Sequence, residues 1–471
     1  MNIARSTVKL FGARVIGKVF WFIGISYLAR ELGAYRMGIF FLFQAFLRIL
    51  AIPADFGLRG AVEKRISEGV ESGAFLSASI FMKLLTLFVL SILILLTRDY
   101  INSYVGGSFA ALLIICLFVY EFSYLAIQTL NGELRVGDTA TLLLIKDIIW
   151  VVLSVSLVLV GMGVVSLIYG VILGHTIVLL WGGYKISTQL DRPSLKHARS
   201  LFHYAKFDAL SGAGSRIFNW LDLILIGFFL SQTSVGMYEI AWKVAVVPLI
   251  FIQSIRTSIF PAISSWNEDN NRAKISQIVK NSTLPAAFFI IPSFFGVLLL
   301  SQPILQLLFG DEYSAAWLVL IVFMIQKIVQ SFDEIFGRTL QAIDKPDLAA
   351  YAMALGVIAN VFLNLILIWS FGMIGAAVGT LLSYVIMAAA RTAFLSRYIK
   401  IEIKSVEIGW CIISSLGMAG WIYLLKKFIV VDSIAILLSI IFSGALVYVS
   451  ATMMYRPLRG DILGGIRNIS S

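Results

Sequence analysis

Cysteine, histidine and charged residues are all scarce in this sequence, and each shortage excludes a class of protein. Among 471 residues there are two cysteines, Cys116 and Cys411, which lie in separate apolar runs and cannot build a disulfide framework or a metal cluster. The three histidines, His175, His197 and His203, are not at ligand spacing, which argues against a zinc site. Charged residues make up 13% of the chain and hydrophobic residues 59%, whereas soluble domains have about 25% and about 45–50%. A soluble core is therefore excluded.

Motifs of catalysis are missing as well. The stretch GARVIGKV at Gly12–Val19 resembles a phosphate-binding loop, but Val19 replaces the Ser or Thr that would hold magnesium, and no strand precedes it. The sequence contains no nucleophile elbow, no metal-binding helix motif and no second ATPase motif. We therefore expect neither an enzyme nor direct use of ATP, and no cofactor or metal.

The net charge of +11 does not indicate nucleic acid as a partner. Nucleic-acid binders gather Lys and Arg on a soluble face, whereas here the charges fall mostly in short loops between apolar runs. Cations are abundant in one set of alternate loops, and the other set holds only Arg30, Arg36, Arg98, Lys426 and Lys427. By the positive-inside rule we expect a multi-pass protein with both termini in the cytoplasm.

Long apolar runs recur along the whole chain, and a run of about 20 residues can cross the roughly 30 Å hydrocarbon core of a bilayer as a helix. The first run lacks a small-residue cleavage site, so we interpret it as a retained helix. The sequence therefore predicts an all-α polytopic membrane protein with about fourteen transmembrane helices. The expected spans are residues 10–29, 38–58, 74–96, 109–130, 141–160, 164–184, 209–230, 235–263, 283–301, 315–337, 348–369, 372–395, 406–425 and 433–453.

Two halves of the chain resemble each other. The segment YRMGIFFLFQA aligns with TSVGMYEIAWK, and the same register places Gly38 on Gly236 and Lys18 on Arg216. Six spans return the chain to the cytoplasm, so both halves keep one direction across the membrane, and a site is expected between them. The expected domains are a six-helix lobe at residues 1–190, a basic cytoplasmic linker at 191–207, a second six-helix lobe at 208–404, and a helix pair with a tail at 405–471.

Polar side chains inside the predicted spans are the candidate site residues. An ionised group at the bilayer centre costs about 2.5–3.5 kcal/mol on insertion scales, so such groups normally face a bundle interior or a wet cavity. Cations in both halves favour a ligand with phosphate or other acid groups, and intramembrane carboxylates are the usual proton carriers. The candidates for binding the acid group and its glycan are Lys18, Arg48, Arg216, Asn219, Lys243, Arg256 and Lys327, and those for ion coupling are Glu121, Asp222 and Glu239.

Structural roles remain open for some of these residues. Lys243 follows Glu239 by four positions, a spacing at which the two can form a purely structural ion pair. Cations near the predicted span ends can reach the interface instead of a cavity. That is our interpretation of Lys83, Lys146, Arg256 and Arg391.

Four stretches in this order resemble the polysaccharide transporter branch of the MOP exporter superfamily. They are GKVFWFIGISYLARELGAYRMGIF, NWLDLILIGFFLSQTSVGMYEIAWKV, LLFGDEYSAAWLVL and NVFLNLILIWSFGMIGAAVGTLLS, within roughly residues 5–400. This branch comprises Wzx-type flippases, with MurJ and, more distantly, MATE drug exporters as relatives. The resemblance implies a V-shaped cavity between lobes, alternating access, and coupling to a proton or sodium gradient or to the membrane potential. MurJ-like proteins carry functional arginines on the first, second and eighth spans, where this chain has Lys18, Arg48, and Lys243 or Arg256.

These observations predict a flippase of lipid-linked oligosaccharides. The resemblance implies that it moves an undecaprenyl-pyrophosphate-linked unit, such as an O-antigen repeat for lipopolysaccharide biosynthesis, to the outer leaflet of a bacterial inner membrane. Its expected partners are the lipid-linked glycan, membrane lipid and a polysaccharide polymerase. The alternatives are a MATE-like small-molecule antiporter, a MurJ-like lipid II flippase, and a scaffold or scramblase for glycan assembly.

Overall fold

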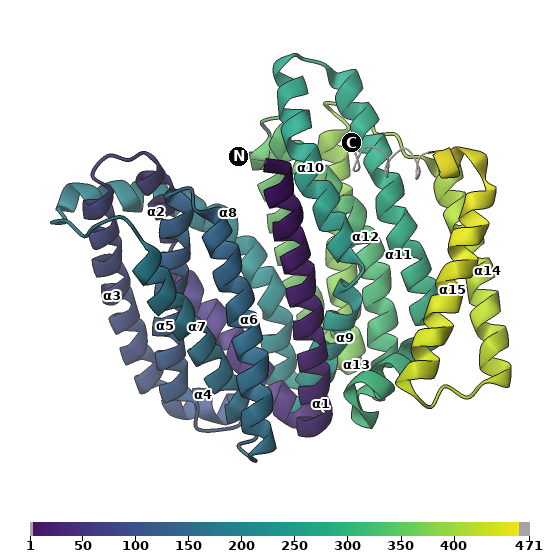
Figure 1. Ribbon diagram of the computed structural model, residues 1–471, viewed down its shortest axis with the longest axis horizontal. Helices are drawn as coiled ribbons and strands as arrows, with labels where there is room; N and C mark the ends of the chain where they lie inside the picture. Colours follow the sequence, from purple (N-terminus) through teal and green to yellow (C-terminus); the bar gives the residue numbers. More distant parts are fainter. Residues whose placement is uncertain (1–2, 461–471) are drawn as a thin grey trace. The chain divides into compact units, whose positions relative to one another are not determined.

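The chain is entirely helical in its regular structure, as predicted. The computed structural model describes residues 3–460, apart from the side chains of residues 3–16, 207–213, 215, 216, 219, 251 and 253–258. All regular secondary structure in this described part is helical (Figure 1). Ten of the described helices are long and apolar enough to cross a membrane. The expected all-α polytopic membrane fold is therefore confirmed.

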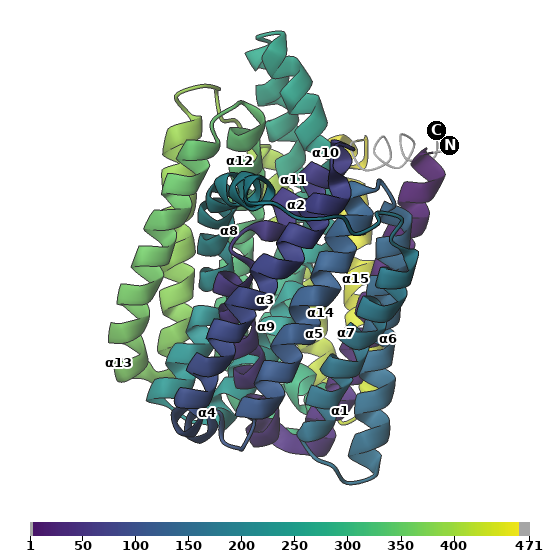
Figure 2. The same cartoon turned by 90° about the vertical axis from the view of Figure 1, so that its left-hand side faces the viewer.

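The chain divides into two compact units, Met1–Gly236 and Met237–Ser471. In the first unit, α3, α5, α7 and α6 lie side by side as long helices, with α2 near one end of α3 and α5 (Figure 2). The helices of this unit are α1 (Ile3–Asp55), α2 (Leu58–Ser67), α3 (Ser72–Leu96), α4 (Arg98–Val105), α5 (Ala110–Gly132), α6 (Val136–Leu159), α7 (Val165–Lys185) and α8 (Leu195–Phe229), and α9 (Gln232–Val246) begins at its end.

The second unit is centred on α11, α12 and α13. In this unit α12 packs against both α11 and α13, while the last two helices pack against each other and against α11. Its elements after α9 are α10 (Leu249–Glu268), α11 (Arg272–Phe309), the 3₁₀ helix η1 (Asp311–Ala316), α12 (Trp317–Ala342), α13 (Pro346–Leu395), α14 (Ser405–Phe428) and α15 (Ile434–Met454).

Two of the long helices are each two helices joined at a glycine. Gly33 in α1 has φ 75° and ψ 170°, and Gly372 in α13 has φ 58° and ψ −136°. Both conformations are strongly disfavoured for residues with a Cβ atom, so glycine permits the break at these two points. The first and second expected spans lie on the two parts of α1, and the eleventh and twelfth lie on the two parts of α13.

The count of fourteen spans stays a prediction, because two expected spans in the middle of the chain do not each correspond to one long apolar helix. The seventh expected span falls on α8, in which the apolar part is the shorter stretch Trp220–Phe229. The eighth is divided between α9 and α10, and Pro248 stands at the N-cap of α10. These segments contain six of the ten predicted site residues, namely Arg216, Asn219, Asp222, Glu239, Lys243 and Arg256.

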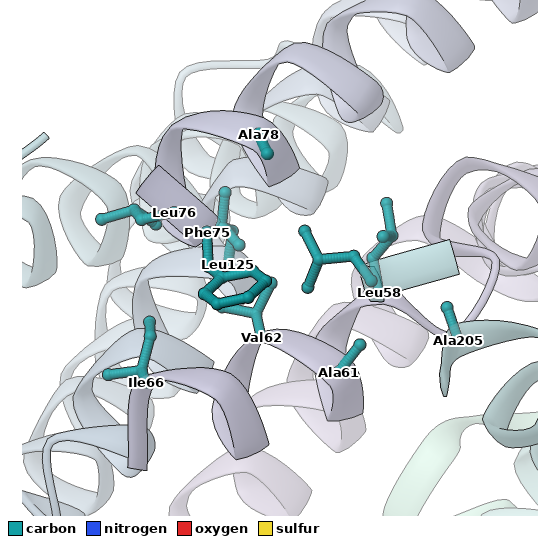
Figure 3. Packing of buried hydrophobic residues seen from close by; sticks show 10 residues of the cluster. Leu58, Ala61, Val62, Ile66, Phe75, Leu76, Ala78, Leu125 and Ala205 are labelled. Atoms are coloured by element: carbon teal, nitrogen blue, oxygen red, sulfur yellow. The ribbon is translucent and has the colours of Figure 1, made fainter. Parts of the chain in front are cut away.

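The short helix α2 is held by a hydrophobic cluster (Figure 3). Leu58, Val62 and Ile66 recur every fourth position and therefore share one face of α2. This face packs against side chains of α3, α5 and α8, all in the first unit. The buried members are Leu58, Ala61, Val62, Ile66, Phe75, Leu76, Ala78, Leu125, Leu201 and Ala205. The cluster fixes the first turn of α2, which carries Arg59.

The glycines that the internal repeat aligned are packing positions. A Cβ atom on Gly38 would lie 1.7 Å from the carbonyl oxygen of Gln232, and one on Gly236 would lie 2.1 Å from that of Ala34. Real Cβ atoms essentially never come that close to backbone. The start of α9 can therefore cross α1 only because both positions lack a side chain.

Candidate functional site

Four charged side chains in the first unit form what we call the ion network: Asp55, Arg59, Lys83 and Glu121. The Lys83 ammonium lies 3.0 Å from Asp55 Oδ1 and 2.6 Å from Glu121 Oε2. The Arg59 guanidinium lies 2.7 Å from Glu121 Oε1 and 3.4 Å from Asp55 Oδ1. Two cations therefore face two carboxylates, and the network is neutral.

The ion network joins four helices. Asp55 ends α1, Arg59 stands in the first turn of α2, Lys83 lies on α3 and Glu121 on α5. Asp55 Oδ1 also accepts a hydrogen bond from the backbone N–H of Arg59, at 3.2 Å, which anchors the start of α2. Removing one partner of a buried ion pair typically costs about 3–5 kcal/mol, because the other charge is left uncompensated. The network therefore has a structural role.

One interpretation from the sequence is wrong at this network. Lys83 does not reach the interface, because its side chain is 0% exposed and Asp55 and Glu121 solvate the ammonium inside the bundle. Glu121, the candidate for ion coupling on α5, has two cationic partners, Arg59 and Lys83. A role for Glu121 in ion coupling, which stays a prediction, would require Lys83 or Arg59 to release it.

Arg48, predicted to bind an acid group, has neutral partners. Its guanidinium donates a hydrogen bond to the Tyr120 hydroxyl, and it lies 4.7 Å from the centroid of the Tyr120 ring and 5.9 Å from that of Trp220. Its Nε atom is buried without a hydrogen-bond partner among the residues that the structure describes. In that part of the chain, no carboxylate offsets the charge of Arg48. A partly buried cation of this kind can attract an anion.

Aromatic rings connect Arg48 to the ion network. Arg59 lies 5.2 Å from the Tyr120 centroid and 4.4 Å from that of Tyr124, so both arginines share the Tyr120 ring. The His175 ring lies 5.0 Å from Tyr120, and its Nδ1 is 2.7 Å from the Ser123 hydroxyl. These neighbours fill space with apolar ring atoms, and charges interact more strongly in such surroundings than in water.

The second unit holds a buried lysine on an aromatic ring. The Lys327 ammonium lies 3.1 Å from the Trp242 ring centroid and 3.2 Å from Gln330 Oε1, and the side chain is fully buried. Cation–π contacts of desolvated cations are worth about 2 kcal/mol or more. Lys327 therefore has a structural partner, and its predicted role in substrate binding stays a prediction.

Further along α12, Asp333 pairs with Arg391. The carboxylate accepts a short hydrogen bond from Arg391 Nη1, and the two side chains are 1% and 10% exposed. Our interpretation that Arg391 reaches the interface is wrong, because its charge is compensated inside the unit. The polar face of α12 continues through Gln330, whose amide donates to Glu334 Oε1 at 2.9 Å. On this face of α12, the Gln330 amide and the Glu334 carboxylate are therefore hydrogen-bonded to each other.

Seven predicted site residues remain. Lys243 and Glu239 form an ion pair at 2.6 Å on α9, as the spacing allowed. Asp222 is buried, whereas Lys18 is exposed on α1. The side chains of three other predicted site residues lie outside the described residues, namely Arg216, Asn219 and Arg256.

Sequence reasoning missed several residues of the first unit. Asp55 and Arg59 are four positions apart at the end of the second expected span, a spacing that could have indicated an ion pair. Tyr120 immediately precedes Glu121, but nothing in the sequence says that its ring meets two arginines. His175 gave no signal beyond being a polar residue in an apolar run.

The sequence is similar to a family of polysaccharide biosynthesis proteins and to individual probable flippases. Residues 27–318 match the family model described as polysaccharide biosynthesis protein. The chain is 45% identical over 459 residues to a probable low-salt glycan biosynthesis flippase of Haloferax volcanii, covering 98% of this chain and 97% of that protein. It is 31% identical to a probable flippase of the same organism, over 81% of each chain.

Solved structures share the fold. The lipid II flippase MurJ in an inward closed conformation superposes with a TM-score of 0.81 at 21% identity, over 96% of this chain and 99% of that one. An inward-facing multidrug MATE transporter of the MOP superfamily gives a TM-score of 0.67 at 15% identity, over 81% of this chain and 95% of that one. The predicted MATE- and MurJ-like architecture is thus confirmed.

Proposed function

This chain belongs to the polysaccharide biosynthesis protein family, and we propose that it is a flippase for a glycan linked to a lipid carrier. The similarity to a probable low-salt glycan biosynthesis flippase and to a probable flippase supports this proposal. The same proposal extends to multi-pass insertion in a cytoplasmic membrane with both termini inside; both relatives come from an archaeon, so the membrane need not be a bacterial one.

The observation that carries the proposed mechanism is the charge of Arg48, which no carboxylate offsets among the described residues. The ion network beside it is neutral, and the contacts of Arg48 are aromatic. A guanidinium presents a planar fork of N–H donors that matches phosphate oxygens. We therefore assign Arg48 to the phosphate group of the lipid carrier, which is a pyrophosphate in our proposal, during alternating access.

The proposed direction of transport follows from the negative charge of the head group. An inside-negative potential favours outward movement of an anionic head group by about 2.3 kcal/mol per charge per 100 mV. The sugars of the head group need a wet path, while the hydrocarbon tail can stay in lipid. A gradient of protons or sodium ions, acting through Glu121, Asp222 or Glu239, is the coupling that we propose in addition.

Transfer measured in proteoliposomes tests this function. A labelled polyprenyl-pyrophosphate oligosaccharide is placed in one leaflet, and the fraction that reaches the other leaflet is followed with and without a membrane potential. We expect protein-dependent transfer that the potential accelerates. Extrusion of small cationic drugs without glycan-lipid transfer would instead favour a MATE-like antiporter, and transfer of lipid II alone would favour a MurJ-like activity.

Transfer that is equally fast in both directions and indifferent to any gradient would point to a scramblase. This outcome would contradict a coupled flippase while leaving the substrate class intact. Absence of any transfer by protein that still melts cooperatively would contradict the proposed function as a whole.

A further inference from the structure

A basic hollow opens in the second unit, and no residue to which we assign a role in transport lines it. It lies between the beginning of α11 and the segment 396–402 that follows α13, and its volume is about 690 Å³. Its walls include Arg272, Ser276, Arg397, Tyr398, Lys400 and Glu402. Sites for small molecules typically measure about 300–1,000 Å³, so a polar head group fits this volume.

Hydrogen bonds to the backbone hold the two walls together. Arg272 Nη1 donates to the carbonyl oxygen of Tyr398 at 3.0 Å, and the Ser276 hydroxyl donates to the carbonyl oxygen of Lys400. The segment after α13 is thereby fixed to the first turns of α11. These two bonds hold the walls of the hollow together within this unit.

The charges of the hollow do not cancel. Glu402 already binds two cations, since its carboxylate lies 2.8 Å from the Lys280 ammonium and 2.7 Å from that of Lys400. The bond from Arg272 goes to a neutral carbonyl, and Arg397 lies 5.7 Å from the centroid of the Phe394 ring. Among the described residues, no carboxylate pairs with either guanidinium group, so both contribute a positive charge to the wall of the hollow. An anion would find two forked donors there.

The position along the helices suggests where this anion comes from. The second part of α13, after Gly372, has about the length that crosses a hydrocarbon core, and the hollow begins immediately after its last residue, Leu395. A residue that directly follows a spanning helix is expected near the level of the lipid phosphate groups. The cation-rich loops of this chain, which include Arg272, Arg397 and Lys400, are those that the positive-inside rule places in the cytoplasm.

We propose that this hollow binds the phosphate group of an anionic lipid of the cytoplasmic leaflet. Basic recesses between transmembrane helices on that side are suited to such head groups. The same donors could also hold a soluble phosphate compound, because the recognised chemistry is identical. The site goes beyond the proposed transport function: it adds a lipid ligand that stabilises the second unit.

Native mass spectrometry of the full chain in detergent tests the proposal. The probes are phosphatidylglycerol, neutral phosphatidylcholine and inorganic pyrophosphate, each titrated separately and in competition. We expect phosphatidylglycerol to bind in preference to phosphatidylcholine. The Arg397→Gln variant should weaken that binding about tenfold, the loss expected for one charge-assisted hydrogen bond. Arg397→Lys should restore part of it.

The matched control is Lys427→Gln, which removes an exposed cation from the last turn of α14, in the same unit but outside the hollow. It should leave the affinity unchanged. Arg397 is the better test residue because Arg272 also holds the backbone of Tyr398, so its loss could disturb the fold. If pyrophosphate displaces phosphatidylglycerol, the hollow also binds soluble phosphate compounds.

The proposal is overturned if Arg397→Gln binds phosphatidylglycerol as the wild type does, or if phosphatidylcholine binds equally well. Equal weakening in Arg397→Gln and Lys427→Gln would also overturn it, because the effect would then be one of net charge. None of these readouts depends on transport, so they stay informative even if the proposed flippase activity fails its own test.

Discussion

At the scale of single residues, Lys83 shows how burial changes the meaning of a charge. The lysine lies inside an apolar run where a long side chain could reach the interface, yet it is held between Asp55 and Glu121. Both carboxylates come from other helices, α1 and α5. No local pattern in the sequence of α3 could announce them. The residue was recognisable as unusual, but its partners were not.

Replacing Lys83 by Met should destabilise the protein by about 3–5 kcal/mol, because two carboxylates would then face one arginine in a buried place. Thermal unfolding of the detergent-solubilised chain measures this loss. The double variant Lys83→Met/Glu121→Gln removes a charge of each sign and should recover part of the stability. If the losses of stability caused by Lys83→Met and by Glu121→Gln simply add in the double variant, the two side chains do not interact and the ion network is contradicted.

Glu402 gives the molecule a contact that depends on pH. Hydrogen bonds from Lys280 and Lys400 lower the pKa of this carboxyl from 4.5 to about 2. Because the folded pKa is the lower one, the carboxylate stabilises the docked segment at pH above about 4.5, and the contribution is lost as the pH falls towards 2. Hydrogen exchange of residues 396–402, corrected for the intrinsic rate, should therefore rise below pH 4.5.

The control for this pH dependence is Glu402→Gln. The variant has no carboxylate to protonate, so its segment 396–402 should already exchange faster at neutral pH and change less on acidification. If wild type and variant respond to acid in the same way, another group controls the docking of this segment.

At the scale of helices, close approach is decided by glycine. Gly38→Leu should push α1 away from the start of α9, because even its Cβ atom would lie 1.7 Å from the Gln232 carbonyl oxygen. Overpacking of this kind usually costs about 1–3 kcal/mol and occasionally more. Thermal unfolding should show the loss, and Gly38→Ala should already show most of it.

A second glycine serves as the matched control for this crossing. Gly137 on α6 has nothing within 4 Å of the place where a Cβ atom would stand. Gly137→Ala should therefore leave the melting temperature unchanged or raise it slightly, since alanine favours helix more than glycine does. Equal effects at Gly38 and Gly137 would show that helix propensity, and not close packing, is being measured.

At the scale of the whole molecule, the direction of the chain across the membrane can be read by labelling. Cys116 and Cys411 are both buried, so single cysteines added at exposed positions should react selectively. We expect Lys196→Cys to be labelled only by a reagent admitted to the cytoplasmic side, and Asp432→Cys only from outside. Labelling of both from one side would contradict the proposed topology.

Much of the fold could be predicted because membrane spans are determined locally. Composition and apolar runs sufficed for the helices, and the repeat singled out Gly38 and Gly236 before their contacts were known. The seventh and eighth spans were predicted at full length, but the apolar part of α8 is the shorter stretch Trp220–Phe229, and the eighth is divided between α9 and α10. Helix ends next to Pro248 and breaks at Gly33 depend on local backbone geometry that hydropathy does not measure.

The site was predictable only in part, because side-chain partners come from distant segments. Arg48 and Glu121 were chosen from the sequence as charged residues inside spans. Arg59 and Tyr120, which give those two residues their surroundings, were not. What separates a paired carboxylate from a free one, or a compensated arginine from an uncompensated one, is the packing of helices that are far apart in sequence.

The central claim is that the Arg48 guanidinium holds the phosphate of the lipid carrier, and one comparison tests it most directly. Transfer of a labelled polyprenyl-pyrophosphate oligosaccharide in proteoliposomes is measured for the wild type, Arg48→Gln and Arg36→Gln. Arg36 is an exposed arginine on the same helix, so its variant matches the change in charge. We predict that Arg48→Gln loses transfer about ten- to a hundredfold, as for a lost charge-assisted bond, while Arg36→Gln retains it. Wild-type transfer by Arg48→Gln would contradict the claim.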